Sequence, residues 1–248
     1  MKGTIWCLHG AVGMAEDWRG FSVPGWATKR VDLWRFLDCC PMGLKAFGVA
    51  LNEEARAVPG RKVLLGYSMG GRLALHALLA DSRPWDAAVV VSAHPGLEDE
   101  DGRKARRASD AEWAARALKG DWREFLAAWN GQEILSESGE ASIFGIENRR
   151  RLEGRRQAVA RSFMDWSLGT QEALAGRLSS IHCPLLWCVG ANDSKFRRLG
   201  ELVMADFEKG GTGVRSGWVA EGAGHRVPWE VGEGFAKKVG EFLEPLDS

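Results

Sequence analysis

One segment restricts the fold of this chain more than any other, because it sets a serine on a tight turn between an apolar strand and a helix. The run Lys62-Val63-Leu64-Leu65 favours a buried strand, Gly66-Tyr67-Ser68-Met69-Gly70 follows it, and residues 71–80 favour a helix. A serine on so short a turn has a strained backbone, so its neighbours must be small, as the flanking glycines are. The start of the helix would direct free N–H groups and the positive end of its dipole toward the serine. The pattern predicts a catalytic Ser68; the alternative is an incidental Gly/Ser turn.

A glycine-rich loop after the first predicted strand is a second element of the same kind. It reads Leu8-His9-Gly10-Ala11-Val12-Gly13, and a loop of this HGxxG pattern can supply a backbone donor to an oxyanion. We assign the two oxyanion donors to the backbone N–H groups of Ala11 and Met69. The imidazole of His9 is interpreted as structural, because the glycines matter more than the ring for this role.

A histidine and a carboxylate can be chosen as partners of the serine from their places late in the chain. His225 lies in Gly222-Ala223-Gly224-His225, between a predicted strand and a predicted helix, and Asp193 lies just beyond the apolar strand that ends at Val189. The chain order Ser, Asp, His is the one that this motif requires. His225 would take the proton of Ser68, and Asp193 would fix the tautomer and stabilise the imidazolium. Asp193 can alternatively be read as the N-cap of the helix that follows, which does not exclude catalysis.

Short apolar runs alternate with longer helical patterns, which is typical of a parallel sheet with crossover helices. We therefore predict an α/β protein with the α/β-hydrolase fold, in which a mostly parallel sheet is flanked by helices and carries a helical lid. Residues 1–95 and 180–248 would form the core and residues 96–179 the lid, with a loop at Ser136–Ser142. The predicted strands are Thr4–Leu8, Arg30–Leu33, Lys62–Leu65, Ala87–Ser92, Pro184–Val189 and Val214–Val219, and the predicted core helices are Gly43–Val58, Gly71–Ala80, Phe196–Glu208 and Trp229–Leu243.

The balance of charge limits the classes of partner. The 33 Lys and Arg residues equal the 33 Asp and Glu residues, so no overall field attracts nucleic acid or a membrane surface, and an anionic substrate must be met by a local cluster. The first residues lack the pattern of a signal peptide, and no apolar run is long enough to span a membrane. The five cysteines are odd in number and form no CxxC, which favours reduced thiols and a cytoplasmic enzyme. The sequence indicates no oligomeric state.

Several short segments together resemble one family, the 2-succinyl-6-hydroxy-2,4-cyclohexadiene-1-carboxylate synthases of menaquinone biosynthesis. The resemblance extends over nearly the whole chain. It rests on Gly66-Tyr67-Ser68-Met69-Gly70-Gly71-Arg72, on His94-Pro95-Gly96-Leu97, on Gly190 with Asp193-Ser194-Lys195-Phe196, on Glu16-Asp17-Trp18, on Arg107 with Ser109-Asp110 and Trp113, on Trp129, and on Ala223-Gly224-His225.

The resemblance implies a lyase, in which a serine–histidine pair abstracts a proton and drives elimination of pyruvate without a metal or another cofactor. By motif, Ser68, Asp193 and His225 form the triad, and Tyr67, Arg72 and Trp129 line the pocket. Arginines of the lid would hold the carboxylates of a small anionic substrate, since a guanidinium is a planar, permanently charged, bidentate donor. The candidates are Arg106, Arg107 and Arg151, the last within a basic tract that is otherwise interpreted as a solvated helix face.

The chain departs from the family at one turn. Relatives carry a Pro-Gly-His-Gly turn after the second strand, whereas here Val31-Asp32-Leu33 runs into Trp34, so the shape of the substrate could differ.

A carboxylester or C–C bond hydrolase would need the same triad but would have no use for Arg72 or a basic lid. A catalytically silent binding protein would need neither the triad nor the oxyanion loops, and the fold alone does not separate the three functions.

Overall fold

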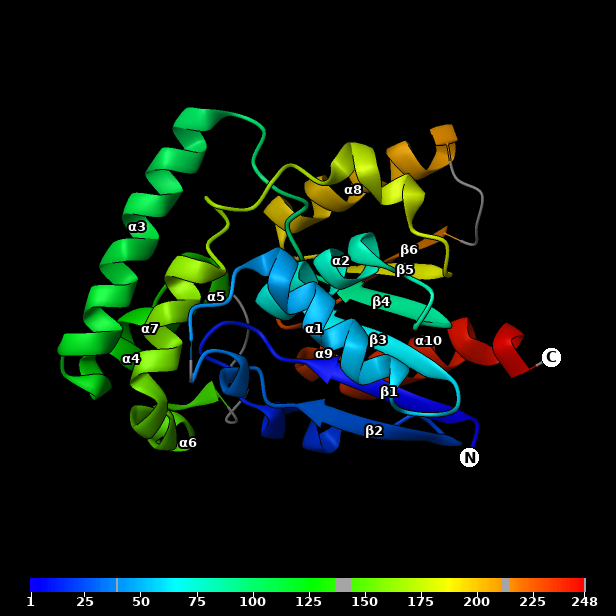
Figure 1. The fold of residues 1–248 in the computed structure, drawn as a ribbon, viewed down its shortest axis with the longest axis horizontal. Coiled ribbons are helices and arrows are strands. Elements are labelled where there is room, and N and C mark those ends of the chain that lie inside the picture. Colours follow the sequence, from blue (N-terminus) through cyan, green and yellow to red (C-terminus); the bar gives the residue numbers. More distant parts are fainter. Residues whose placement is uncertain (39, 137–143, 211–214, 248) are drawn as a thin grey trace.

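The computed structural model describes the chain except for residues 39, 137–143, 211–214 and 248, and its centre is a six-stranded parallel sheet (Figure 1). The strand order is β2-β1-β3-β4-β5-β6, and all five neighbouring pairs are parallel. This sheet and its flanking helices confirm the predicted α/β class. The strands are β1 (Gly3–Leu8), β2 (Trp26–Val31), β3 (Lys62–Tyr67), β4 (Ala87–Val91), β5 (Leu185–Gly190) and β6 (Arg215–Ala220).

The burial of each strand explains how accurately its position was predicted from the sequence. Every residue of β4 and of β5 is buried, as expected for central strands with helices on both faces. β2 is an edge strand, and only its first and last residues, Trp26 and Val31, are buried. The prediction of a strand at Arg30–Leu33 was therefore displaced by several residues, because the half-exposed run Ala27-Thr28-Lys29-Arg30 does not have the apolar pattern of a buried strand.

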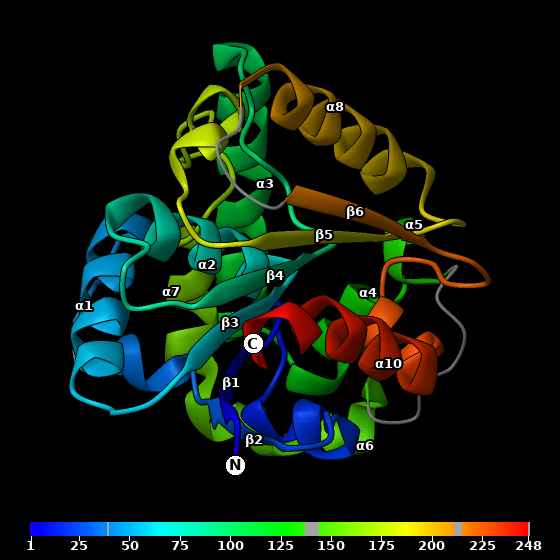
Figure 2. The ribbon, with the colours of Figure 1, turned by 90° about the vertical axis from the view of Figure 1, so that its right-hand side faces the viewer.

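Helices cover both faces of the sheet (Figure 2). Helices α1 (Leu44–Arg56), α2 (Met69–Ala80) and α8 (Ser194–Gly210) pack against one face, and η1 (Ala15–Gly20), α9 (Val227–Glu230) and α10 (Gly232–Leu243) lie on the other. Alternate strand residues enter two separate hydrophobic clusters, so that Trp6 and Leu8 belong to one cluster while Ile5 and Cys7 belong to the other. The single helix predicted at Trp229–Leu243 is two helices, since the backbone of Val231 leaves the helical region (φ −126°, ψ 43°).

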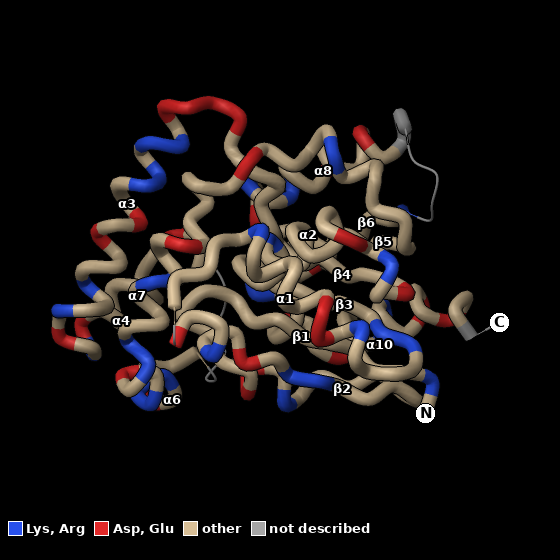
Figure 3. Tube along the Cα trace, viewed as in Figure 1, with Lys and Arg blue, Asp and Glu red and all other residues tan. Residues whose placement is uncertain are grey.

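The helices α3 to α7, which come between β4 and β5 in the sequence, gather beyond one end of the sheet (Figure 1). These helices are α3 (Glu100–Lys119), α4 (Trp122–Asn130), α5 (Glu133–Ser136), α6 (Ile146–Arg149) and α7 (Arg156–Asp165), with 3-10 segments at Arg150–Arg155 and Ala175–Ser180. Asp99 and Asp121 cap α3 and α4 by accepting backbone N–H bonds. Charges of both signs are spread along α3 (Figure 3). The loop predicted at Ser136–Ser142 begins at the last residue of α5, and its remainder lies outside the described residues.

The described residues give three results that bear on the predicted class of protein. None of the helices there is sufficiently long and apolar to cross a membrane. Cys7, Cys183 and Cys188 are buried free thiols and Cys40 is an exposed one, while Cys39 lies outside the described part of the chain. No group of three or more His, Cys, Asp or Glu side chains within the described ranges is arranged to hold a metal ion.

Candidate active site

Ser68 lies at the junction of β3 and α2, in a backbone conformation that side chains rarely adopt. Its φ is 52° and its ψ is −112°, outside the allowed regions for most residues. The surrounding structure fixes this conformation, because the Ser68 N–H donates to the Val91 carbonyl at 2.8 Å and its own carbonyl accepts the Arg72 N–H at 3.1 Å. A Cβ atom on Gly70 would lie 2.5 Å from the carbonyl oxygens of Leu8 and His9, so this position requires glycine.

His225 connects Ser68 to a buried carboxylate. Its Nε2 lies 3.1 Å from the Oγ of Ser68, and its Nδ1 lies 2.7 Å from Oδ2 of Asp193. The side chains of His225 and Asp193 are both buried. The other oxygen of Asp193 accepts the Phe196 N–H at 3.0 Å, so the carboxylate also caps the start of α8. The two interpretations of Asp193 from the sequence, histidine partner and helix cap, therefore hold together. The arrangement can move a proton between Ser68 and His225.

The predicted oxyanion donors lie beside the serine. Ala11 and Met69 line the same cavity as Ser68, and Met69 is the first residue of α2, whose N–H has no acceptor within the helix. The imidazole of His9 is fully buried, donates from Nδ1 to the Gly10 carbonyl at 2.9 Å and accepts the Leu33 N–H at Nε2 (3.3 Å). Burial lowers its pKa to about 4, so it is neutral at pH 7 and braces the loop.

The segment that replaces the family's Pro-Gly-His-Gly turn supports this loop from outside. Besides the bond from Leu33 to His9, the indole N–H of Trp34 donates to the Gly13 carbonyl at 2.9 Å. The ring of Trp34 also contacts that of His9, with 5.0 Å between their centroids. The departure in sequence therefore contributes to holding the oxyanion loop in place.

A cavity opens from Ser68 toward Arg72, and we call it the Arg72 cavity. Its walls are formed by Ala11, Ser68, Met69, Arg72, Ser92, His94, Arg106, Trp129, Gln132, Glu133, Ile134, Leu135, Leu168, Lys195, Phe196 and His225. The guanidinium of Arg72 is buried and donates to the Gln171 amide oxygen at 3.1 Å and to the Trp166 carbonyl at 2.7 Å. No described carboxylate forms an ion pair with it, so a structural salt bridge does not account for its burial. Burial, together with the nearby charge of Arg106, lowers the pKa of Arg72.

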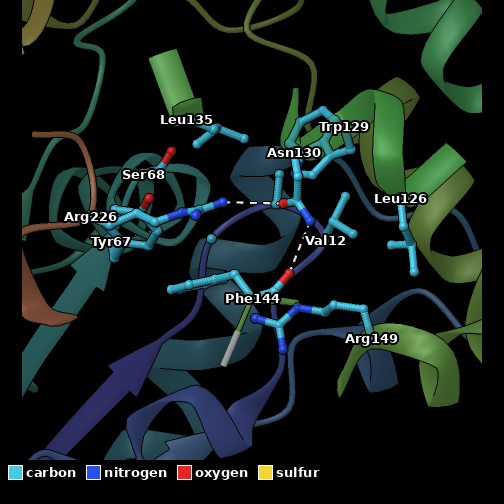
Figure 4. A pocket seen from close by; sticks show the side chains of 13 residues that line it. Val12, Tyr67, Ser68, Leu126, Trp129, Asn130, Leu135, Phe144, Arg149 and Arg226 are labelled. Carbon is cyan, nitrogen blue, oxygen red and sulfur yellow. Dashed lines mark hydrogen bonds between the residues drawn. The ribbon is translucent and has the colours of Figure 1, made fainter. Parts of the chain in front are cut away.

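A second cavity, the oxyanion-loop cavity, is shown in Figure 4 and shares Ser68 with the Arg72 cavity. It is bounded by Gly10, Ala11, Val12, Gly13, Tyr67, Ser68, Leu126, Trp129, Asn130, Leu135, Phe144, Arg149 and Arg226. Ala11, Ser68, Trp129 and Leu135 line both cavities. Tyr67 packs against His225, with ring centroids 5.5 Å apart. Arg149 and Arg226 are not among the site residues predicted from the sequence, although Arg226 follows the predicted catalytic histidine directly.

The three arginines predicted from the lid occupy different environments. Arg106 lines the Arg72 cavity while its Nε donates to the buried Asp110 at 2.9 Å. Arg107 lies outside the lining of both cavities, and its guanidinium binds the Glu100 carboxylate at 2.7 Å and the Gly169 carbonyl at 2.9 Å. Arg151 is exposed and likewise lies outside both linings. Within the basic tract, the buried arginine that points into a cavity is Arg149, two positions earlier, because α6 turns that position inward.

The fold and the Ser68–His225–Asp193 arrangement are those of an α/β hydrolase, and a family model described as "Alpha/beta hydrolase family" matches residues 7–238. The chain is similar to the 2-succinyl-6-hydroxy-2,4-cyclohexadiene-1-carboxylate synthase of Serratia proteamaculans, with 30% identity over 79% of this chain and 78% of that protein. The protein of the same name from Pectobacterium atrosepticum is 31% identical over 78% of this chain and 79% of that one. The chain therefore belongs to the α/β hydrolase family and, within it, to the sequence family of these synthases.

A solved structure agrees with this assignment of the fold. The structure of MenH from S. aureus covers 100% of this chain and 96% of its own, with a TM-score of 0.76 and 18% sequence identity. The predicted α/β-hydrolase fold is thus confirmed. The family match and the named relatives together identify the chain as an enzyme.

Proposed function

We propose that the protein is a carbon–oxygen lyase that eliminates pyruvate from 2-succinyl-5-enolpyruvyl-6-hydroxy-3-cyclohexene-1-carboxylate. The product would be 2-succinyl-6-hydroxy-2,4-cyclohexadiene-1-carboxylate, the compound in the printed name of the relatives. The observation that carries the proposal is the buried guanidinium of Arg72, which reaches the cavity of Ser68 without an acidic partner among the described residues. A buried cation without a counter-ion is costly, and an anionic substrate would compensate it.

Binding of this substrate is assigned to residues of the Arg72 cavity. The substrate carries carboxylates on its ring, its succinyl chain and its enolpyruvyl group, and a guanidinium can bind such a group through two parallel hydrogen bonds. Arg72 and Arg106 supply positive charge, while Trp129 and Tyr67 offer aromatic surface beside Ser68. Arg107 and Arg151 have no proposed part in binding, because neither lines the Arg72 cavity or the oxyanion-loop cavity.

The proposed chemistry is a proton transfer coupled to loss of the enolpyruvyl group. Ser68, with its own proton passed to His225, removes the ring proton next to the succinyl ketone. The electrons of that C–H bond shift the ring double bond, and the C–O bond to the enolpyruvyl group breaks. The departing enolate receives the proton at carbon from His225 by way of Ser68 and becomes pyruvate, so no water is consumed. The N–H groups of Ala11 and Met69 stabilise the enolate oxygen that forms on the succinyl ketone.

The proposal includes the kind of partner and the location of the protein. We expect it to bind a small anionic substrate and neither nucleic acid nor a membrane. The equal numbers of basic and acidic residues and the cations of the cavity support this expectation. A cytoplasmic location is supported by the buried free thiols Cys7, Cys183 and Cys188. Asp193 stabilises the imidazolium of His225 from the removal of the ring proton until a proton is returned to the leaving enolate. It would stabilise the same imidazolium in a carboxylester or C–C bond hydrolase.

A paired assay tests the function. Release of pyruvate from the enolpyruvyl substrate is measured beside hydrolysis of short nitrophenyl esters, with the Ser68→Ala variant as a control for uncatalysed loss. The proposal expects pyruvate release to exceed ester hydrolysis in kcat/KM by at least about a hundredfold, since only the acid uses the cations of the site. Ester hydrolysis without pyruvate release would instead identify a hydrolase of the same fold.

A further inference from the structure

The oxyanion-loop cavity contains a second buried guanidinium, that of Arg226. Arg226 follows His225 directly, is 6% exposed, and reaches the cavity that also contains Ser68 and Tyr67 (Figure 4). Its Nη2 donates to the Asn130 side-chain oxygen at 3.2 Å, and its guanidinium lies over the Phe144 ring, 4.2 Å from the centroid. Both protein partners are neutral, so they do not balance the charge of Arg226.

Two carboxylates lie near the cavity, those of Asp17 and Glu230, and neither is ion-paired with Arg226. Asp17 is ion-paired with Arg149 at 2.8 Å and therefore compensates that guanidinium. Glu230 accepts the Gly224 N–H at 2.6 Å through Oε2, its Oε1 is buried without a hydrogen-bond partner among the described residues, and no described carboxylate forms an ion pair with Arg226. The two guanidiniums approach the same Phe144 ring, with Arg149 at 4.9 Å from its centroid, and Nη1 of Arg149 is buried without a hydrogen-bond partner. The described lining of the cavity thus includes two guanidiniums and no carboxylate, together with an unused buried donor.

We infer that Arg226, with Nη1 of Arg149, forms a carboxylate-binding subsite on the oxyanion-loop side of Ser68. The subsite lies within the oxyanion-loop cavity and is separate from the subsite at Arg72. Because the two cavities meet at Ser68, a ligand that fills both must carry at least two carboxylates, one for each positive pole. The inference deepens the proposed function, on which it rests for the identity of the acid, and makes Arg226 a determinant of specificity for polycarboxylates.

A purely structural role for Arg226 makes different predictions. In that role Arg226 would only tie Asn130 of α4 and Phe144 to the core, and its loss would lower stability without regard to the charge of the ligand. A substitution that keeps a hydrogen-bond donor but removes the charge separates the roles. Arg226→Gln does this, and Arg226→Lys keeps the charge but loses the planar, bidentate geometry.

Calorimetric titration with three related acids tests the subsite on the full chain. The probes are 2-(3-carboxypropionyl)benzoate, which has two carboxylates, and its two analogues that each lack one of them, 3-benzoylpropionate and 2-butyrylbenzoate. Arg150→Gln is the matched control, because Arg150 is an exposed arginine paired with Glu147 and lies outside both cavity linings. Thermal unfolding of each variant is recorded in parallel.

The subsite predicts that Arg226→Gln weakens the diacid and one of the two monoacids by roughly tenfold or more, the scale of losing one charged hydrogen-bond partner. The affinity for the other monoacid should stay within about twofold, Arg226→Lys should recover part of the loss, and Arg150→Gln should match the wild type. Equal weakening of all three acids, or no weakening, would overturn the subsite. So would failure of the wild type to bind any of them. Pyruvate release is assayed separately, so a protein that binds these acids through Arg226 but releases no pyruvate would retain the subsite and lose the proposed function.

Discussion

Asp193 holds His225 with one carboxylate oxygen and the backbone of α8 with the other: Oδ2 lies 2.7 Å from Nδ1 of His225, and Oδ1 accepts the Phe196 N–H at 3.0 Å. One side chain therefore connects the orientation of the imidazole with the start of a core helix. The two contributions can be separated by experiment, because an amide keeps an acceptor oxygen but loses the negative charge.

Asp193→Asn is expected to lower kcat by about a thousandfold or more, because the imidazolium of His225 loses its stabilising charge and the ring its correct tautomer. The midpoint of thermal unfolding should change little, since the amide oxygen can still cap α8. Asp193→Ala should lose activity to a similar degree and also about 1 kcal/mol of stability, the usual contribution of a cap. An Asn variant with close to wild-type turnover would contradict the role given to the carboxylate.

Ser68→Ala and His225→Ala should each lower kcat/KM for pyruvate release by at least about a thousandfold, because the two side chains act as one proton-transfer unit. The double variant should be scarcely worse than either single variant for the same reason. Circular dichroism serves as the control for folding. If the two losses multiplied in the double variant, Ser68 and His225 would have to act independently.

Arg72→Ala should cost about 2–4 kcal/mol in kcat/KM for the acidic substrate, the range for removing one partner of a buried charge pair. Arg72→Lys should recover only part of this, because a lysine cannot reproduce the bidentate geometry. Hydrolysis of a small neutral ester, where measurable, should barely change, and Arg123→Ala on the exposed face of α4 provides a control for loss of charge. Equal losses on the acid and the ester would mean that Arg72 supports only the fold, through its bonds to Gln171 and Trp166.

Stability should fall as the pH is lowered below neutrality. Burial lowers the pKa of His9, His76 and His94 from 6.5 to about 4, so between these values the unfolded chain binds more protons than the folded one. The free energy of unfolding therefore rises with pH across this interval and falls in the opposite direction. Urea unfolding should show that the free energy of unfolding is lower at pH 5 than at pH 7 by at least about 1 kcal/mol. This is well below the sum for three histidines at roughly 1.4 kcal/mol per pKa unit, because the shifts are discounted for solvent screening.

His76→Leu is the control for this dependence on pH. Nε2 of His76 is buried without a hydrogen-bond partner, so leucine should be tolerated at this position while removing one titrating group. The variant should lose less stability than the wild type between pH 7 and pH 5, and the comparison cancels the contribution of carboxyl groups such as Asp17, whose pKa burial raises. The same loss in both proteins would show that His76 is not one of the groups responsible.

Predictions from the sequence were correct for the parts of the protein whose structure requires particular residue types at nearby positions. Buried central strands read as continuous apolar runs, and the turn at Ser68 needs glycine at fixed positions, so both were visible without a structure. The edge strand Trp26–Val31 was placed too late in the sequence, because its solvent-facing residues carry charge. The break at Val231 has no glycine or proline at that residue to indicate it.

The spacing of the arginines in the sequence does not show which of them line a cavity. Arg149 and Arg151 lie in one basic tract, and only the path of α6 and the following 3-10 segment decides that Arg149 is buried while Arg151 is exposed. Arg226 could have been noticed from its position next to His225, yet its cavity forms only when Asn130 and Phe144 meet it from the segment between β4 and β5. Contacts between segments about a hundred residues apart follow from tertiary packing and leave no local signal.

The claim that Ser68 acts as a base, and is never acylated, is the centre of the proposed lyase mechanism. A single-turnover reaction of excess enzyme with the enolpyruvyl substrate, stopped at successive times and followed by intact-protein mass measurement, tests it most directly. The account predicts that the protein keeps its unmodified mass at every time point while pyruvate accumulates. An adduct on Ser68 that forms and decays at the rate of turnover would contradict it and identify a hydrolase.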